Sequence, residues 1–206
     1  HLLQACDFSP RQNLHVRMAA LFHDIGKPVS MKVSEEGGIT FHGHDKLSSK
    51  MTHAILSRLR FPKAVEQHVC HLIENHMIVY SETWSDGAVR RFIARIGRPF
   101  LDDLFLLLEA DCSGKQGSPF GSAFLQPFKR RIAQINEQDS ALSLRDLAVN
   151  GKTLKEKCGI PSGPVMGVIL NELLDTVLDD PSQNTEERLV SIAARIYRNI
   201  SPSDRS

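Results

Sequence analysis

Apolar side chains recur every three or four residues along most of the chain, which is the spacing of one face of an α-helix. One such series runs through Leu14, Met18 and Leu21, and another runs through Val65 and Val69. We find no segment that alternates between apolar and polar residues as a half-buried strand would. The pattern therefore predicts an all-α fold.

Turn residues divide this pattern into short helices. Gly26, Gly97 and Gly159 each follow the end of an apolar series, and Pro164 suits the first turn of the helix that comes next. Segment 33–41 is predicted to be a loop or a short hairpin. Helices are predicted over residues 14–24, 45–59, 65–76, 89–96, 101–111, 121–138, 165–178 and 184–197, the last of them starting with a capping-box-like pair, Asn184 and Glu187.

The distribution of histidine indicates two domains. All nine histidines lie in the first 76 residues, and the following 130 residues have none. Such a bias is typical of metal-binding segments. We therefore predict a histidine-rich helical bundle over residues 1–140 and a small helical tail domain over residues 141–206.

The composition excludes several classes of protein. Hydrophobic residues make up 41% and charged residues 24% of the 206 residues, as in ordinary globular proteins, and the net charge of +1 requires any phosphate-binding surface to be local. The four cysteines form no C-x-x-C pair, which favours free thiols in a reducing compartment. The longest apolar run is far shorter than the ~20 residues of a membrane span. We expect a cytoplasmic protein, with an upstream part missing before His1.

The adjacent pair His23 and Asp24, within LFHDIGKP, is the sharpest candidate for chemistry. It is predicted at the end of a helix, where neighbouring side chains can converge on one cavity. Asp111 continues an otherwise apolar stripe, and a charge in such a place needs a cation partner. His1, His44 and His76 can also be placed at helix ends or on inner faces. Imidazole and carboxylate ligands of this mix suit Mn²⁺, Fe, Ni, Zn or, less well, Mg²⁺.

Several longer segments carry a resemblance to known families. They are AALFHDIGKP, FHGHDKLSSKM, ENHM, AVRRFI, EAD, DLAVNGKTL and GIPSGPVMGVILNELL. The His-Asp pair resembles the HD-domain metal-dependent phosphohydrolases, and the whole series resembles the C-terminal half of bacterial tRNA nucleotidyltransferases and related poly(A) polymerases, over most of residues 1–195. The resemblance implies an HD-domain helical bundle, one or two divalent ions, and these metal ligands: His1, His23, Asp24 and Asp111, with His44 and His76 for a second ion.

The activity that the resemblance implies is hydrolysis of a phosphomonoester or a 2′,3′-cyclic phosphodiester, with a phosphorylated nucleotide or an RNA 3′ end as substrate. Asp24 and Lys27 are the predicted catalytic residues: Asp24 bridges two ions or orients a metal-activated water, and Lys27 holds a phosphate as a point charge. The residues predicted to bind phosphate or RNA are Arg90, Arg91, Lys129 and Arg130.

The resemblance also implies a full-length protein with a further, upstream domain. The family's nucleotide-adding head, with a Gly-Ser loop and paired carboxylates, has no counterpart in these residues. Nucleotide transfer is therefore not expected from this chain alone, and an upstream nucleotidyltransferase domain and tRNA are the expected partners of the full-length protein.

Two other functions stay open. The chain can be a non-catalytic RNA-binding body with a vestigial HD site, whose affinity for RNA falls steeply with salt. It can instead be a regulatory HD domain that senses a nucleotide.

Single residues also have plainer interpretations. Asp111 can be a core carboxylate paired with Arg91, Lys27 a helix-end cation, and His1 a disordered end. His44 can cap a helix, and His76 can be an ordinary core histidine. The remaining histidines are assigned to surface or core: His15, His42, His53, His68 and His71.

Overall fold

The computed structural model of the chain describes residues 1–34, 36–115, 125–138 and 144–200. The chain forms two compact units, one made of residues 1–82 with 96–129 and the other of residues 83–95 with 130–206. The predicted boundary near residue 140 falls outside the described residues, so the division into domains at that point stays a prediction.

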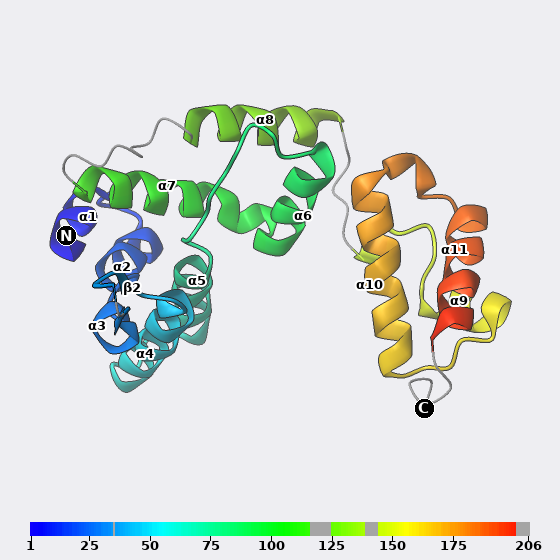
Figure 1. Ribbon diagram of the computed structural model, residues 1–206, viewed down its shortest axis with the longest axis horizontal. Helices are drawn as coiled ribbons and strands as arrows, with labels where there is room; N and C mark the ends of the chain where they lie inside the picture. The colour runs from blue at the N-terminus through cyan, green and yellow to red at the C-terminus, as the bar shows by residue number, and fades with distance from the viewer. Residues whose placement is uncertain (35, 116–124, 139–143, 201–206) are drawn as a thin grey trace. The chain divides into compact units, whose positions relative to one another are not determined.

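The first unit contains a group of packed helices and one small hairpin (Figure 1). Helix α2 packs against α5 and α7, α1 packs against α7 and α2, and α4 packs against α5. A two-stranded antiparallel hairpin, β1 (Lys32–Val33) and β2 (Ile39–Thr40), precedes α4. The helices are α1 (Leu2–Phe8), α2 (Leu14–Phe22), α3 (Lys27–Ser30), α4 (His44–Arg58), α5 (Lys63–Glu74) and α7 (Arg98–Gly114).

Helix α2 is central to this unit, and its sequence explains why. The side chain of Asn13 caps the helix by accepting a hydrogen bond from the backbone N–H of Val16. Val16, Ala19 and Ala20 are fully buried, and the two alanines leave room for neighbouring helices. The C-terminal end of α2 consequently lies in the interior, which places the next residues of the chain there as well.

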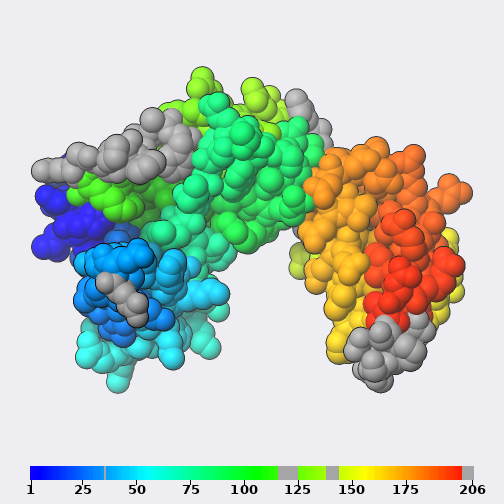
Figure 2. All heavy atoms as spheres, in the orientation of Figure 1, coloured from blue at the N-terminus to red at the C-terminus, as the bar shows by residue number. Residues whose placement is uncertain are grey.

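The second unit is built around α10. Ile169 and Leu173 of α10 and Leu189 of α11 are fully buried in one apolar cluster. The side chains of α10, in orange, and α11, in red, adjoin in the space-filling view (Figure 2). The remaining elements of the chain are α6 (Asp86–Ile96), α8 (Leu125–Gln138), η2 (Leu144–Asp146), α9 (Gly151–Cys158), α10 (Pro164–Asp179), η3 (Pro181–Gln183) and α11 (Glu186–Asn199).

The fold class predicted from the sequence is confirmed, since the regular structure of the described residues is helical apart from one hairpin. A short hairpin was one of the two possibilities predicted for segment 33–41. Gly159 ends α9 in the left-handed region, with φ +68°, and Pro164 opens α10, both as predicted. None of the helices within the described ranges is long and apolar enough to cross a membrane.

Some predicted helix ends were wrong. Helix α11 is capped at Thr185 instead of Asn184, because the Asn184 side chain accepts a hydrogen bond from the Ala148 backbone 2.8 Å away. Helix α2 ends at Phe22, so His23 is its C-cap and Asp24 lies in the turn beyond. Residues 121–124 of the predicted helix 121–138 lie outside the described residues, and α8 begins at Leu125.

Candidate metal centre

The turn that follows α2 brings two helices together around His23 and Asp24. Gly26 lies in this turn, and its backbone N–H donates to Ser48 Oγ of α4 at 2.9 Å. A Cβ atom on Gly26 would lie 2.8 Å from Ser48 N and 2.9 Å from His44 O, closer than real Cβ atoms come to such atoms. The absence of a side chain at Gly26 therefore lets the first turn of α4, with His44, approach Asp24.

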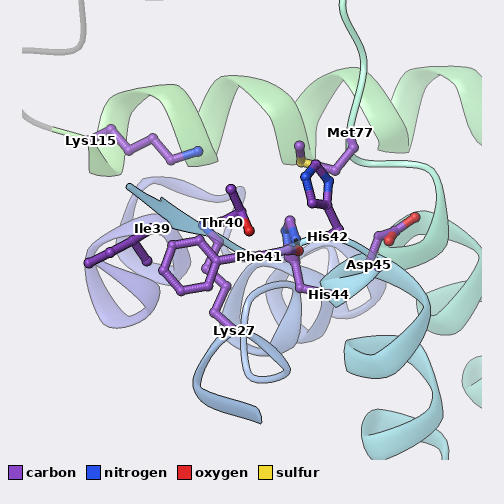
Figure 3. A pocket seen from close by; sticks show the side chains of 10 residues that line it. Lys27, Ile39, Thr40, Phe41, His42, His44, Asp45, Met77 and Lys115 are labelled. Carbon is purple, nitrogen blue, oxygen red and sulfur yellow. Dashed lines mark hydrogen bonds between the residues drawn. The ribbon is translucent and has the colours of Figure 1, made fainter. Parts of the chain in front are cut away.

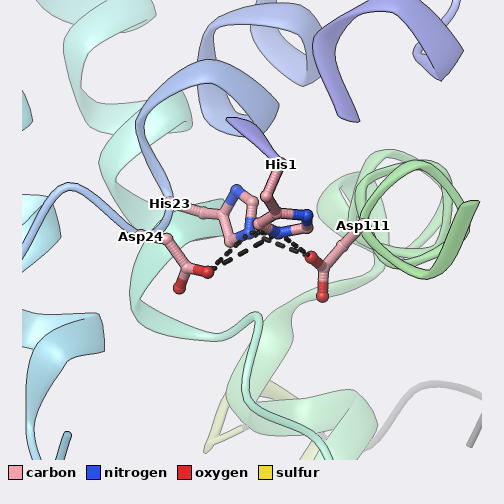
Figure 4. Close-up of side chains that lie close together, drawn as sticks. All are labelled: His1, His23, Asp24 and Asp111. Carbon is pink, nitrogen blue, oxygen red and sulfur yellow. Dashed lines mark hydrogen bonds and ion pairs between the residues drawn. The ribbon is translucent and has the colours of Figure 1, made fainter. Parts of the chain in front are cut away.

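His1, His23, Asp24 and Asp111 form one compact group (Figure 4). His1 Nε2 lies 2.8 Å and His23 Nε2 lies 3.0 Å from the same oxygen, Asp111 Oδ1. Asp24 Oδ2 lies 3.4 Å from His23 Nε2 and 3.6 Å from His1 Nε2. His23, Asp24 and Asp111 are buried, whereas the His1 side chain keeps 29% of its surface exposed. The group thus has an interior side and an open side.

Asp24 belongs to a second group as well, through its other oxygen. Asp24 Oδ1 lies 3.2 Å from His44 Nε2 and 3.6 Å from His76 Nε2, and all three side chains are buried. The two oxygens of Asp24 therefore face different sets of imidazole nitrogens. A carboxylate placed in this way can hold two ions side by side, as in two-metal hydrolytic sites.

The three buried imidazoles are oriented in the same manner. The Nδ1 atoms of His23, His44 and His76 each lie 2.7–2.9 Å from the backbone carbonyl three residues earlier, at Ala20, Phe41 and Ile73. Because the carbonyl needs a donor, Nδ1 carries the proton in the neutral form of each ring, and in that form the lone pair is on Nε2. Histidines that ligate metals are held by this kind of outer contact.

Two buried atoms of the second group lack hydrogen bonds. Within the described residues, Asp24 Oδ1 and His44 Nε2 make none that has proper geometry, although they lie 3.2 Å apart. Buried polar atoms without partners are rare and call for an explanation such as a bound ion. The donor set, imidazole nitrogen with carboxylate oxygen, fits a divalent transition metal. We conclude that these residues are suited to one or two such ions.

The charged groups of the centre shift the pKa values of His23 and Asp24. Burial lowers the pKa of His23, but hydrogen bonds to Asp111 and Asp24 outweigh it and raise the pKa to about 9 from 6.5. Burial acts to raise the pKa of Asp24, yet the imidazoles of His23 and His76 and the ammonium of Lys27 hold it well below its usual range. In the metal-free protein a protonated His23 therefore lies between the carboxylates of Asp24 and Asp111, and it supplies part of the positive charge that a metal ion would bring.

From the raised pKa of His23 we predict how the stability of the metal-free protein depends on pH. A pKa raised on folding stabilises the protein fully below the unfolded pKa of 6.5, and the stabilisation is lost as pH rises through about 9. We expect the free energy of unfolding of chelator-treated protein to fall by roughly 3 kcal/mol between pH 6.5 and 9.5. Urea unfolding at several pH values measures this free energy. The decrease should be absent in His23→Gln, and an equal decrease in that variant would show that His23 does not cause the pH dependence.

A pocket of about 490 Å³ opens beside the centre (Figure 3). Its lining includes His44 of the second group, the ring of Phe41, and two lysines that contact the first group. Lys27 Nζ lies 2.5 Å from Asp24 Oδ2, and Lys115 Nζ lies 2.5 Å from Asp111 Oδ2. The pocket therefore joins metal-ligand-type side chains to two ammonium groups, each of which can bind a phosphate as a point charge, and the carboxylate of Asp45 also lines it.

Lys115 is the residue that the sequence analysis missed. It is four positions after Asp111, the spacing that puts two side chains on one helix face, so the ion pair was detectable from the sequence. The interpretation of Asp111 as a partner of Arg91 was wrong, because Asp111 contacts Lys115, His1 and His23, and Arg91 pairs with Asp179.

Three of the other predicted phosphate-binding residues have contacts of their own among the described residues. Arg90 donates to the Leu178 carbonyl, and both arginines belong to the second unit. Lys129 pairs with Glu109 at 2.6 Å, and Arg130 is exposed on α8. Their role in binding phosphate or RNA stays a prediction.

Comparison with known proteins gives the chain its relatives. It is 32% identical to an A-adding tRNA nucleotidyltransferase of Deinococcus radiodurans over 171 residues, which are 81% of this chain and 38% of that protein. It is 31% identical to a CC-adding tRNA nucleotidyltransferase of Thermus thermophilus over 180 residues, 86% of this chain and 39% of that protein. A multifunctional CCA protein of Herminiimonas arsenicoxydans is 38% identical over 64 residues, 30% of this chain and 15% of that protein.

The fold and the buried side chains define an all-α protein, with one short hairpin and with a centre of metal-ligand type in its first unit. The family described as tRNA nucleotidyltransferase domain 2, putative, matches residues 40–193, and the chain belongs to this family. It spans about two fifths of the length of the curated tRNA nucleotidyltransferases of Deinococcus and Thermus that it matches. No solved structure matches it significantly.

Proposed function

We propose that the chain is a metal-dependent phosphohydrolase of the HD type that forms the C-terminal part of a tRNA nucleotidyltransferase-like protein. The observation that carries the proposal is Asp24, whose two oxygens face two groups of histidine nitrogens at the edge of a lysine-lined pocket. A structural ion pair would need neither a second histidine group nor an adjoining pocket. The proposed substrate is a phosphomonoester or a 2′,3′-cyclic phosphodiester, on a nucleotide or at an RNA 3′ end.

In this proposal the side chains of the centre are the ligands of divalent ions. His1, His23, Asp24 and Asp111 would hold one ion, and Asp24, His44 and His76 a second. When bound, the ions lower the pKa of a water and offset negative charge that builds on phosphoryl oxygens. The backbone carbonyls behind His23, His44 and His76 keep the Nε2 atoms directed inward, so these side chains need little reorientation to bind an ion.

Lys27 and Lys115 have a separate role in the proposal, which is to hold the phosphate. Each lysine contacts a carboxylate of the centre and also lines the pocket. A phosphate that enters the pocket can therefore approach both ammonium groups while it faces the ligand cluster. The ring of Phe41 in the same lining offers a flat apolar surface against which a nucleobase can stack.

The proposal predicts a measurable role for Lys115. Lys115→Met removes one positive charge from the pocket but none of the proposed metal ligands. We expect KM for a phosphate ester to rise about tenfold, which corresponds to about 1.4 kcal/mol of binding, with the number of bound ions unchanged. Lys157→Met, which breaks an exposed ion pair with Glu186 in the second unit, is the matched control and should leave KM unchanged. Equal KM values in both variants would refute the role of Lys115.

The activity itself is tested with substrates. Chelator-stripped protein is reloaded in turn with Mn²⁺, Ni²⁺, Zn²⁺ or Mg²⁺, and the hydrolysis of bis(p-nitrophenyl) phosphate and of 2′,3′-cyclic AMP is followed. We expect turnover that depends on the metal and disappears on chelation. If no ion supports turnover of either substrate, or of a monoester such as p-nitrophenyl phosphate, the hydrolase proposal fails.

The names of the relatives favour a second, compatible role as a body that binds tRNA in the longer protein. In that role the basic residues Arg90, Arg91, Lys129 and Arg130 contact phosphates. Affinity for tRNA that falls steeply with salt supports this role, and affinity independent of salt refutes it.

A further inference from the structure

Another group of metal-ligand-type side chains lies outside the centre described above. His15 of α2, His68 of α5 and Asp103 of α7 have ligand atoms that all lie within 4.8 Å of one another. Each residue is partly buried, so the group borders solvent. The proposed phosphohydrolase does not use any of the three side chains.

The new group is displaced from the first centre along the same helices. His15 and Asp103 precede His23 and Asp111 by eight residues each, which is about 12 Å along a helix axis. His68 likewise precedes His76 by eight residues. The group is therefore a separate site on the contact between α2, α5 and α7, and does not extend the first one.

Asp103 is held in place by a neighbouring side chain. Asn13 Nδ2 donates to Asp103 Oδ1 at 2.6 Å, while Asn13 Oδ1 caps α2. The other oxygen, Asp103 Oδ2, is left to face His68 Nε2 at 2.7 Å. A carboxylate whose second oxygen is fixed by an outer hydrogen bond is the arrangement seen around metal ligands.

His68 Nε2 is poorly satisfied despite this short distance. The atom is buried, and its approach to Asp103 lacks the direction of a hydrogen bond, so it has no hydrogen-bonded partner in the part of the chain that the structure describes. The rings of His15 and His68 stack in parallel, with centroids 4.1 Å apart and planes 8° from parallel. Burial and the nearby His15 lower the pKa of His68, which favours the neutral imidazole that a metal needs.

We propose that His15, His68 and Asp103 bind a divalent transition-metal ion, with Zn²⁺ as the representative of the class. Two imidazoles and one carboxylate form a ligand set that Zn²⁺ accepts, with a fourth position left to water. One ring must turn out of the stack so that both nitrogens converge on the ion. The bound ion links α2, α5 and α7, and therefore stabilises the first unit.

The test separates this site from the first centre. A background variant, Asp24→Asn with His44→Gln, weakens the first centre, and Zn²⁺ binding to stripped protein is measured by isothermal titration calorimetry. We expect the background to retain a Zn²⁺ equivalent whose affinity drops at least tenfold on adding either His68→Gln or Asp103→Asn. Adding His53→Gln, a histidine of α4 outside all three groups, should leave that affinity unchanged.

The proposal is overturned if His68→Gln and Asp103→Asn both leave every Zn²⁺ equivalent intact. Asp103→Asn keeps the size of the side chain, so this variant alone tests the proposed Zn²⁺ site if His68→Gln unfolds. If the background itself does not fold, long-range ¹H–¹⁵N spectra of the parent chain titrated with Zn²⁺ decide it. Shifts of the His15 and His68 ring nitrogens support the site, and their constancy at saturation refutes it. Because neither readout requires turnover, the result is independent of the proposed hydrolase activity.

Discussion

Asp24→Asn is expected to lower metal-dependent phosphoester hydrolysis by about 10³-fold or more, equal to about 4 kcal/mol of activation free energy. The substitution removes the negative charge from the one side chain that both ligand groups share. An amide has a single oxygen, so it cannot present a carboxylate oxygen to His23 on one side and to His44 on the other. Both ions should therefore bind more weakly, and turnover should be lost together with them.

Three measurements together distinguish this effect from simple unfolding. Ions per chain and kcat are determined for the parent, for Asp24→Asn and for Asp7→Asn, which removes an exposed carboxylate of α1. Circular dichroism establishes that each variant is helical. Full ion content and full activity in a folded Asp24→Asn variant would contradict the shared role of this carboxylate.

Gly26→Ala is expected to destabilise the protein by about 1–3 kcal/mol, the usual cost of overpacking. The new Cβ would meet backbone atoms of α4 at 2.8 and 2.9 Å, and backbone cannot turn away as a flexible side chain can. The start of α4 must therefore shift, and His44 shifts with it. We expect the ion held by His44 and His76 to be lost before the ion held by His1, His23 and Asp111.

The control for this prediction is another glycine to alanine change. At Gly167 of α10 an added Cβ meets nothing within 4 Å, so Gly167→Ala should stabilise the protein, by roughly 0.5–1 kcal/mol as is usual in helices. Chemical unfolding measures the free energy of unfolding of both variants. We expect it to decrease in Gly26→Ala and to increase in Gly167→Ala. An unchanged stability and ion content in Gly26→Ala would show that the close approach of the turn to α4 is not required.

The longer helices were predictable from the sequence because the apolar period is a local property, whereas the short helices α1 and α3 were not predicted. Leu14, Met18 and Leu21 marked α2, and the left-handed Gly159 and the opening Pro164 marked helix ends. The prediction of Asn184 as a helix cap was wrong because its side chain accepts a hydrogen bond from the distant backbone N–H of Ala148, a contact that no local pattern reports.

The candidate site was predictable only in part. Residue type and order suggested His1, His23, Asp24, Asp111, His44 and His76, and the structure brings all six into two groups that share Asp24. The pairing of Asp111 with Lys115 followed a helical spacing that was overlooked. The group of His15, His68 and Asp103 comes from three helices, and its members become neighbours only when α2, α5 and α7 pack.

The shared role of Asp24 is tested most directly by locating ions in crystals of the chain grown with Mn²⁺, from anomalous diffraction at the manganese edge. The account predicts two peaks about 4 Å apart, as in two-metal sites. One peak should lie among His1, His23 and Asp111, the other should lie beside His44 and His76, and the carboxylate of Asp24 should contact both. Crystals saturated with Mn²⁺ that show no peak within coordination distance of Asp24 would contradict the account.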